Sequence, residues 1–215
     1  MEPLRHGYTN RTVGDGRTVV KRYDGPDAAA RCQRERRMLG ELAGVVPVPP
    51  LLGSDAESVR MGFVAGVHGQ ELMKAGRAVG VMRACGEVLR LMRDAPAPAG
   101  TGLVHGDFGP NNVLIDPVAF TVTAVLDWEF SYYGDPVTDL AWCEWVVRTH
   151  HAEDVAAIPE LHAAWGLPVP AWPVRRAAMV ARCEAYRDFN ERWAAGGSGV
   201  RRWEGLIAAT SAWSE

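Results

Sequence analysis

The sequence predicts an α+β fold with two lobes: a small N-lobe with an antiparallel β-sheet and one helix, and a larger, mostly α-helical C-lobe. Short runs rich in β-branched residues alternate with turns in the first 62 residues, whereas amphipathic helical patterns dominate after residue 78. Several glycines lie between these regions, as in a flexible connector. We expect an N-lobe over residues 1–62, a C-lobe over residues 63–215 and a hinge at about 61–66.

The N-lobe is expected to contain a hairpin, a helix and a further strand. Residues 17–23 are β-branched and aromatic-rich and follow the turn at residues 14–16, and another strand is expected over residues 59–64. The intervening helix has one stripe of small or apolar residues and a glutamate: Ala28, Cys32, Glu35, Leu39 and Leu42. A carboxylate on a buried stripe must find a cation or stay protonated, so we expect Glu35 to pair with Lys21 on the preceding strand.

The C-lobe begins with a second amphipathic helix, which is indicated by a stripe of apolar residues: Ala78, Met82, Cys85, Leu89 and Met92. Residues 113–116 and 123–126 are short apolar runs separated by Pro117, and they predict paired strands. From Gly134 onward the sequence looks helical and is interrupted by prolines.

Composition and charge exclude several classes of protein. The net charge is −3, and the local arginine cluster at residues 31–37 is interpreted as a solvated helix face, so no nucleic-acid partner is expected. The four cysteines are far apart, which indicates reduced thiols. The N-terminus has no apolar core of a signal peptide, and no apolar run approaches the roughly 18 residues of a membrane span. We expect a cytoplasmic protein without membrane contact, and leave monomer and dimer open.

The most informative segment contains His105, Asp107 and Asn112 in the spacing H-x-D-x-x-x-x-N. Enzymes that transfer phosphoryl groups use this spacing, with the aspartate orienting a hydroxyl and the asparagine holding a metal ion. A second acid, Asp127, follows an apolar run that would deliver it to the same site as the end of a strand.

The sequence strongly resembles the aminoglycoside phosphotransferase and choline kinase superfamily, small-molecule kinases that share the protein-kinase fold. The resemblance is carried by residues 105–116, 125–129 and 134–141. Weaker support comes from Gly7-Tyr-Thr-Asn10, Val20-Lys21, Glu35 and Pro47-Val-Pro49, so the match extends to about Trp142. It implies a bilobal protein-kinase-like fold.

The resemblance also implies roles for individual residues. Asp107 would accept or orient the proton of the acceptor hydroxyl. Asn112 and Asp127 would hold Mg²⁺ through hard oxygen ligands. Lys21 would contact the phosphates of ATP and be fixed by Glu35.

Three acidic or basic residues near the motif have alternative interpretations. Glu129 is either a further metal ligand or a carboxylate that merely points into the cleft, with similar weight. His105 is expected to orient the loop by hydrogen bonding, and Asp139 to brace it, in preference to taking part in the chemistry.

Gly106 stands where many protein kinases have arginine, and together with the short segment between Asp127 and Asp139 it favours a small-molecule kinase without a regulated loop.

The nucleotide-binding residues are the weakest part of the resemblance, because residues 7–10 do not read G-x-G-x-x-G. The Thr9 hydroxyl and the backbone near Asn10 are candidates for capping a phosphate, and a simple surface turn is the alternative. The base of ATP or GTP is expected against the connector, at Met61, Phe63 and Val64.

We expect the acceptor to be recognised by the part of the chain after residue 127. All eight tryptophans lie there. Tryptophans in helices are more often core than pocket, and we weigh these two readings at about two to one. Acids that suit a cationic acceptor occur in the same region, although each is more often a solvated helix charge: Glu144, Glu153, Asp154, Glu184 and Asp188.

These observations together predict an ATP- and Mg²⁺-dependent O-phosphotransferase acting on a hydroxyl of a small molecule. An antibiotic of the aminoglycoside type is the leading acceptor. The alternatives are a metabolite kinase with a choline-, homoserine- or sugar-like acceptor, and an inactive pseudokinase that serves as a binding module.

Overall fold

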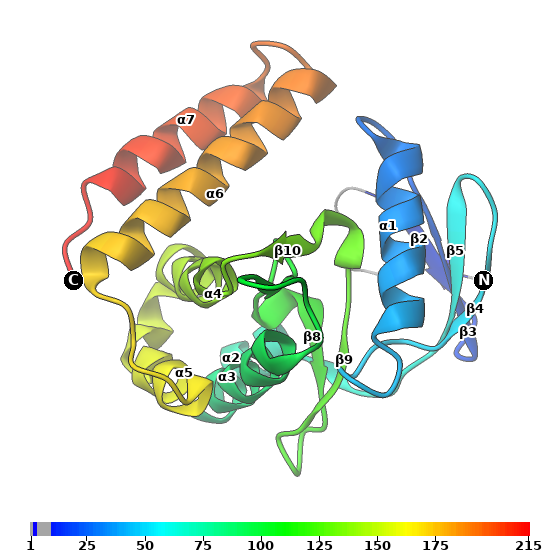
Figure 1. Cartoon of the computed structure of the whole chain (residues 1–215), viewed down its shortest axis with the longest axis horizontal. Helices are drawn as coiled ribbons and strands as arrows, with labels where there is room; N and C mark the ends of the chain where they lie inside the picture. Colours follow the sequence, from blue (N-terminus) through cyan, green and yellow to red (C-terminus); the bar gives the residue numbers. More distant parts are fainter. Residues whose placement is uncertain (1, 4–9) are drawn as a thin grey trace.

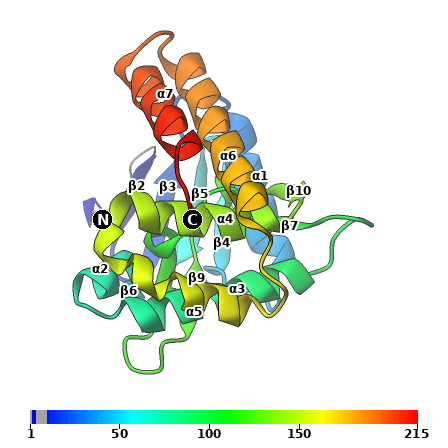
Figure 2. The same ribbon diagram turned by 90° about the vertical axis from the view of Figure 1, so that its left-hand side faces the viewer.

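The computed structural model describes residues 2–3 and 10–215 and contains a β-rich N-terminal part and a mostly helical C-terminal part (Figures 1 and 2). The predicted α+β fold is therefore confirmed. The N-terminal sheet is antiparallel, has the order β1-β2-β3-β5-β4, and consists of β1 (Glu2–Pro3), β2 (Arg11–Gly14), β3 (Thr18–Arg22), β4 (Leu51–Ser54) and β5 (Ser58–Gly62).

Helix α1 (Ala28–Glu41) packs against β4 and β5 through the stripe that the sequence predicts. Cys32 and Leu39 are buried on this stripe, and Glu35 is buried with them. In the central pair of strands, Lys21 of β3 lies opposite Val59 of β5, and both side chains are buried. This register places the ammonium group of Lys21 under α1.

The connector that the sequence marks by glycines contains two short elements, β6 (Val67–His68) and α2 (Gly69–Lys74). Both are too short to give a periodic pattern of their own. Helix α3 (Ala78–Asp94) follows with the expected buried stripe, and it packs against α5 (Ile158–Trp165).

Four short strands frame the segment with the phosphoryl-transfer motif. They are β7 (Gly102–Val104), β8 (Val113–Ile115), β9 (Val122–Val125) and β10 (Tyr132–Gly134). Strands β8 and β9 pair antiparallel, as the two apolar runs predict, and β6 extends this sheet. Strand β7 pairs with β10, which brings the loop after Val104 beside the loop before Tyr132.

The C-terminal part is completed by α4 (Val137–His150), the 3₁₀ turn η3 (Ala152–Ala157), α6 (Trp172–Trp193) and α7 (Ser198–Ser211). Helices α6 and α7 lie side by side, on the opposite side of α4 from α3 and α5 (Figures 1 and 2). They form a separate apolar cluster with α4 instead of joining the main core.

The far end of α6 reaches back to the loop before α1. Arg192 forms an ion pair with Asp27 at 2.9 Å. A side chain at Gly25 would overlap the ring of Trp193, with 2.3 Å from its Cβ to the nearest ring atom. Helix α6 thus contacts both parts of the chain.

Helices of the described residues are all too short or too polar to cross a membrane. The four cysteines are buried and free, as expected.

Two glycine-to-alanine changes in helices are predicted to have opposite effects on stability. In Gly86→Ala the new Cβ would lie 2.5 Å from the Leu161 carbonyl oxygen, so α3 and α5 must separate. We expect the free energy of unfolding to fall by about 1–3 kcal/mol. Gly205 of α7 has no neighbour within 4 Å of such a Cβ, so Gly205→Ala should raise it by about 0.5–1 kcal/mol. Denaturant unfolding measures both, and an unchanged Gly86→Ala would contradict the close helix contact.

Candidate active site

The catalytic-loop candidate His105 is completely buried and links two segments of the site. Its Nδ1 accepts a hydrogen bond from the backbone N–H of Asp107 at 3.1 Å, and its Nε2 lies 2.7 Å from the carbonyl oxygen of Leu126. This pattern requires a neutral ring with the proton on Nε2. Burial lowers the pKa of His105 to about 4, which agrees with the neutral form. The ring orients the loop.

Asp139, in the first turn of α4, braces the same loop. Its two carboxylate oxygens accept hydrogen bonds from the backbone N–H of His105 at 2.5 Å and of Gly106 at 2.9 Å. Burial raises the pKa of Asp139 to about 7, although both hydrogen bonds oppose this rise. The bracing role expected from the sequence is therefore the one this carboxylate has.

The backbone of Gly106 explains why arginine is absent from this position. Its φ is +81°, and a Cβ here would lie 2.5 Å from the carbonyl oxygen of Phe130. The tight approach of the two loops therefore requires glycine.

Asp107 is partly buried, and its carboxylate is fixed from two sides. Asn112 donates from Nδ2 to the Asp107 backbone oxygen at 2.7 Å and to Oδ2 at 3.1 Å. The indole N–H of Trp142 on α4 donates to Oδ1 at 3.1 Å. Burial raises the pKa of Asp107, and the neighbouring Tyr186 hydroxyl, Arg182 guanidinium and Trp142 indole oppose the rise.

Lys21 lies at the centre of a buried network of acids. Its ammonium is 2.6 Å from Glu35 Oε2, 2.8 Å from Asp127 Oδ1 and 3.2 Å from Glu129 Oε1. The Tyr23 hydroxyl also hydrogen-bonds Glu35. Burial alone would raise the pKa of Asp127, but Lys21 more than offsets this and lowers it. The pairing of Lys21 with Glu35 is the contact that the apolar stripe of α1 suggested.

Glu129 ties α1 to the segment after Asp127. Its Oε2 forms an ion pair with Arg31, and its Oε1 accepts a hydrogen bond from Asn10 Nδ2 at 2.7 Å. Arg34 donates to its backbone oxygen at 2.7 Å. Arg31 is only 1% exposed, so the interpretation of the arginine cluster as a solvated face is wrong for Arg31, although it holds for the exposed Arg36 and Arg37. The carboxylate of Glu129, 98 residues away in the sequence, draws Arg31 into the interior.

The residues proposed to bind the nucleotide differ in how exposed they are. Thr9 lies outside the described residues. Asn10 is buried, and its amide contacts Glu129 and Arg31. Met61 is buried, whereas Phe63 is 49% exposed where the chain leaves β5. Val64 is half-buried beside it.

Two oxygens at the site suit a hard divalent cation. Because the amide nitrogen of Asn112 is committed to Asp107, its Oδ1 remains without a hydrogen bond among the described residues. Asp127 uses Oδ1 for Lys21, and its Oδ2 likewise has no described partner. Carboxylate and amide oxygens are the ligands that Mg²⁺ prefers in proteins. The residues present therefore fit this ion.

Trp142 belongs to the core, which is the more frequent of the two roles that the sequence left open for the tryptophans. It is buried and stacks on Trp145 at 4.2 Å between ring centroids, and it also contacts Asp107. Tyr186 and Arg182 of α6 approach the same carboxylate. Sequence reasoning missed these two residues, because α6 lies far along the chain and its pattern is that of any packed helix.

Two of the acids expected near the acceptor, Glu144 and Asp188, are paired with cations of the chain itself. Glu144 is fully buried and pairs with Arg148 at 2.8 Å, Arg175 at 2.9 Å and His162 at 3.2 Å. Its pKa falls to about 2, because these partners outweigh the effect of burial. Asp188 pairs with Arg187 on the surface.

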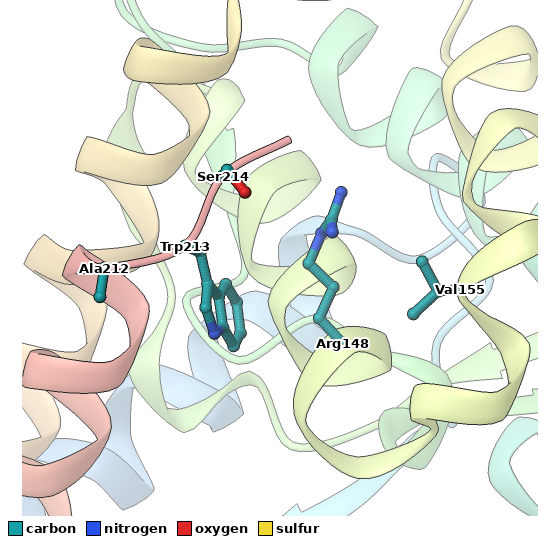
Figure 3. A pocket seen from close by; sticks show the side chains of 5 residues that line it. All are labelled: Arg148, Val155, Ala212, Trp213 and Ser214. Atoms are coloured by element: carbon teal, nitrogen blue, oxygen red, sulfur yellow. The ribbon is translucent and has the colours of Figure 1, made fainter.

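A hollow of about 360 Å³ lies at the other end of α4 and is separate from the catalytic loop (Figure 3). It is lined by Arg148, Val155, Ala212, Trp213 and Ser214. None of these residues belongs to the motif segments.

Solved structures with the same fold include kinases in complex with nucleotide and antibiotic. The GDP and kanamycin complex of APH(2")-IIia has a TM-score of 0.74 at 15% identity, and covers 98% of this chain and 92% of that one. A thermostable mutant of aminoglycoside phosphotransferase APH(4)-Ia, in a ternary complex with ADP and hygromycin B, has a TM-score of 0.70 at 17% identity, with 99% and 94% covered. At this identity the likeness shows the fold alone.

Curated relatives share shorter segments with the chain. Hygromycin-B 4-O-kinase of Escherichia coli is 32% identical over 108 residues, which are 45% of this chain and 30% of that protein. Acyl-CoA dehydrogenase family member 11 of Mus musculus is 48% identical over 52 residues, 24% of this chain and 7% of that protein. The chain thus matches less than two thirds of the length of either relative.

The sequence pattern of the phosphotransferase enzyme family (APH) matches residues 1–102 and 91–178, which together are most of the chain. This match agrees with the protein-kinase-like fold and with the motif segments. The chain belongs to the phosphotransferase enzyme family.

Proposed function

We propose that the protein transfers the γ-phosphoryl group of ATP or GTP to a hydroxyl of a small molecule, with Mg²⁺ as cofactor. The observation that carries this proposal is the convergence of four side chains from distant segments. Lys21 contacts Asp127 at 2.8 Å, and Asn112 contacts Asp107 at 3.1 Å. A pseudokinase would have no need to keep all four.

Asp107 is the proposed base of the reaction. The acceptor oxygen forms a bond to the γ-phosphorus while the bond from that phosphorus to the β–γ bridging oxygen breaks. The nucleoside diphosphate leaves with the electron pair, and the acceptor proton passes to the Asp107 carboxylate. Asn112 and Trp142 hold this carboxylate in one orientation, which favours in-line attack.

Lys21 is proposed to contact the phosphates, with Glu35 fixing its position. Asn112 and Asp127 would hold Mg²⁺, which neutralises phosphate charge when bound. Glu129 is the least suited to the metal, because Arg31 and Asn10 already engage both of its oxygens. We assign it to joining α1 and the metal-binding loop.

The nucleotide base is proposed to lie at Met61, Phe63 and Val64, with a hinge at about 61–66 between lobes at residues 1–62 and 63–215. The end of β5 and the exposed ring of Phe63 support this placement. Thr9 and the backbone near Asn10 remain proposed phosphate contacts. Solved neighbours carry GDP in one case and ADP in another, which supports testing both nucleotides.

An aminoglycoside-type antibiotic is the first acceptor to test, because solved neighbours contain kanamycin and hygromycin B. A metabolite kinase is the second candidate, and one observation favours its sugar-like acceptor, which carries no cationic group. Glu144, the fully buried acid of the C-terminal helices, is neutralised by its own cationic partners and cannot serve a cationic acceptor. Expression in a sensitive bacterium, with profiling of resistance, separates these candidates.

Replacing the base tests the proposal directly. Asp107→Asn should lower kcat by about 10²–10⁴-fold, because the amide cannot take the proton. Nucleotide binding by calorimetry should persist. The matched control is Asp94→Asn, an exposed acid at the end of α3, and it should leave ADP release unchanged. Undiminished phosphorylation by Asp107→Asn would overturn the assignment.

Lys21 combines a structural and a chemical role, which a double variant separates. Lys21→Met leaves buried carboxylates unpaired and should lower the free energy of unfolding by about 3–5 kcal/mol. Adding Glu35→Gln removes one of these charges, so stability should partly recover while ADP release remains low. Denaturant unfolding and a coupled ADP assay measure the two properties. Recovery of both together would show that Lys21 acts only on stability.

The neutral His105 predicts a pH dependence of stability. Its pKa is about 4 in the folded chain and 6.5 in the unfolded chain, so between these values only the unfolded chain binds the proton. The stabilisation is present above pH 6.5 and is lost as pH falls through 4, by on the order of 3 kcal/mol. The free energy of unfolding should be measured against pH for wild type and His105→Gln. The difference between the two proteins should be smallest near pH 4 and largest above pH 6.5. Parallel curves would contradict a neutral buried ring.

A further inference from the structure

Arg182 of α6 is a largely buried arginine whose polar neighbours are the Tyr186 hydroxyl, Asp107 and Asp139. Its Nε has no exposed surface and no hydrogen bond, and no ion pair within the described part of the chain includes it. The guanidinium carbon lies 4.5 Å from the ring centroid of Tyr186 and 5.6 Å from that of Phe130. Two aromatic faces therefore hold the cation in place.

The hydroxyl of Tyr186 is a second buried group without a hydrogen bond of normal geometry. Its ring is fixed in a stack, 5.4 Å from Trp142 and 4.8 Å from Trp203 between centroids. Trp142 in turn donates to Asp107 at 3.1 Å. Arg182 and Tyr186 thus lie beside the proposed base, and the Tyr186 hydroxyl faces its carboxylate.

Leaving such donors unpaired is costly. A guanidinium has five N–H donors, and a buried donor without an acceptor costs about 1–3 kcal/mol, more when it is charged. Asp107 can meet only part of this demand, because its carboxylate already accepts hydrogen bonds from Trp142 and Asn112 and also faces the Tyr186 hydroxyl. Asp139 uses both oxygens for backbone N–H groups. An acceptor from outside the chain would complete the arrangement.

We propose that Arg182 and Tyr186 form an oxyanion-binding subsite beside Asp107. This inference rests on the proposed phosphotransferase function and names a specificity-determining element of the same site. The oxyanion has two possible sources, which are a non-bridging oxygen of the transferring phosphoryl group and an anionic group of the acceptor. The planar guanidinium suits either, because phosphate and carboxylate both accept two parallel hydrogen bonds.

The two sources have different consequences for the acceptor. If the subsite binds the phosphoryl group, its donors stabilise charge that develops in the transition state, and acceptor charge is unconstrained. If it binds the acceptor, a cation beside Asp107 favours anionic hydroxyl compounds over polycations.

The test compares wild type, Arg182→Met and Arg182→Lys with Arg187→Met, an exposed arginine on the same helix. The phosphoryl source is probed by calorimetry with Mg-ADP, alone and with aluminium fluoride as a mimic of the transferring group. If the phosphoryl group is the ligand, all variants should bind Mg-ADP alike, and Arg182→Met should lose roughly 100-fold in affinity for the fluoride complex. Arg182→Lys keeps the charge and should lose less.

The acceptor source is probed with three hydroxyl compounds of similar size and different charge: gluconate, sorbitol and glucosamine. If the acceptor supplies the oxyanion, ADP release by wild type should be stimulated most by gluconate, and Arg182→Met should lose this preference. Arg187→Met should have the same affinity for the fluoride complex and the same preference among the three hydroxyl compounds as wild type.

The outcomes separate the subsite from the proposed function. If wild type binds no Mg-ADP and no Mg-ATP, the phosphotransferase proposal itself fails. If wild type binds them but Arg182→Met behaves as wild type with the fluoride complex and with all three hydroxyl compounds, the oxyanion subsite is overturned. Retained Mg-ADP binding by Arg182→Met shows that the variant is folded.

Discussion

The buried ammonium of Lys21 lies between three carboxylates that come from α1 and from the segment after β9. The buried carboxylates of Glu35 and Glu129 need a cation in the interior, so strand β3, helix α1 and the 127–129 segment must stay together. Arg31 is the second buried cation of the network. Two cations thus face three carboxylates, with Asp107 close by, and this excess of negative charge suits a site that attracts a divalent ion.

The loop that begins at His105 owes its shape to hydrogen bonds between backbone groups and buried polar side chains. Asp139 accepts both N–H groups at residues 105 and 106, and the ring of His105 joins the loop to the end of β9. Gly106 and Asp127 both have positive φ, which is unusual for an aspartate. The two turns face each other because β7 pairs with β10. Rigid backbone contacts therefore position the acids before any ligand arrives.

The sequence predicted the parts of the fold with a strong local signal. A glutamate on an apolar stripe pointed to Lys21, and two β-branched runs predicted the β8–β9 pair. Strand β6 and helix α2 were missed, because two to six residues carry no periodicity. The burial of Arg31 depends on a carboxylate far along the chain, and the approach of α6 to Asp107 depends on how helices pack. Neither can be read from local spacing.

Helix α6 also limits how far the two parts of the molecule can move. Its last turn meets the loop before α1 through Arg192 and Asp27 and through Trp193, which lies against Gly25. The ion pair is exposed and is therefore weak and screened by salt. The indole contact depends on the absence of a side chain at Gly25 and is insensitive to salt. Any movement at the proposed hinge that separates Gly25 from α6 has to break this ring contact, so the contact opposes such a separation in a way that salt does not weaken.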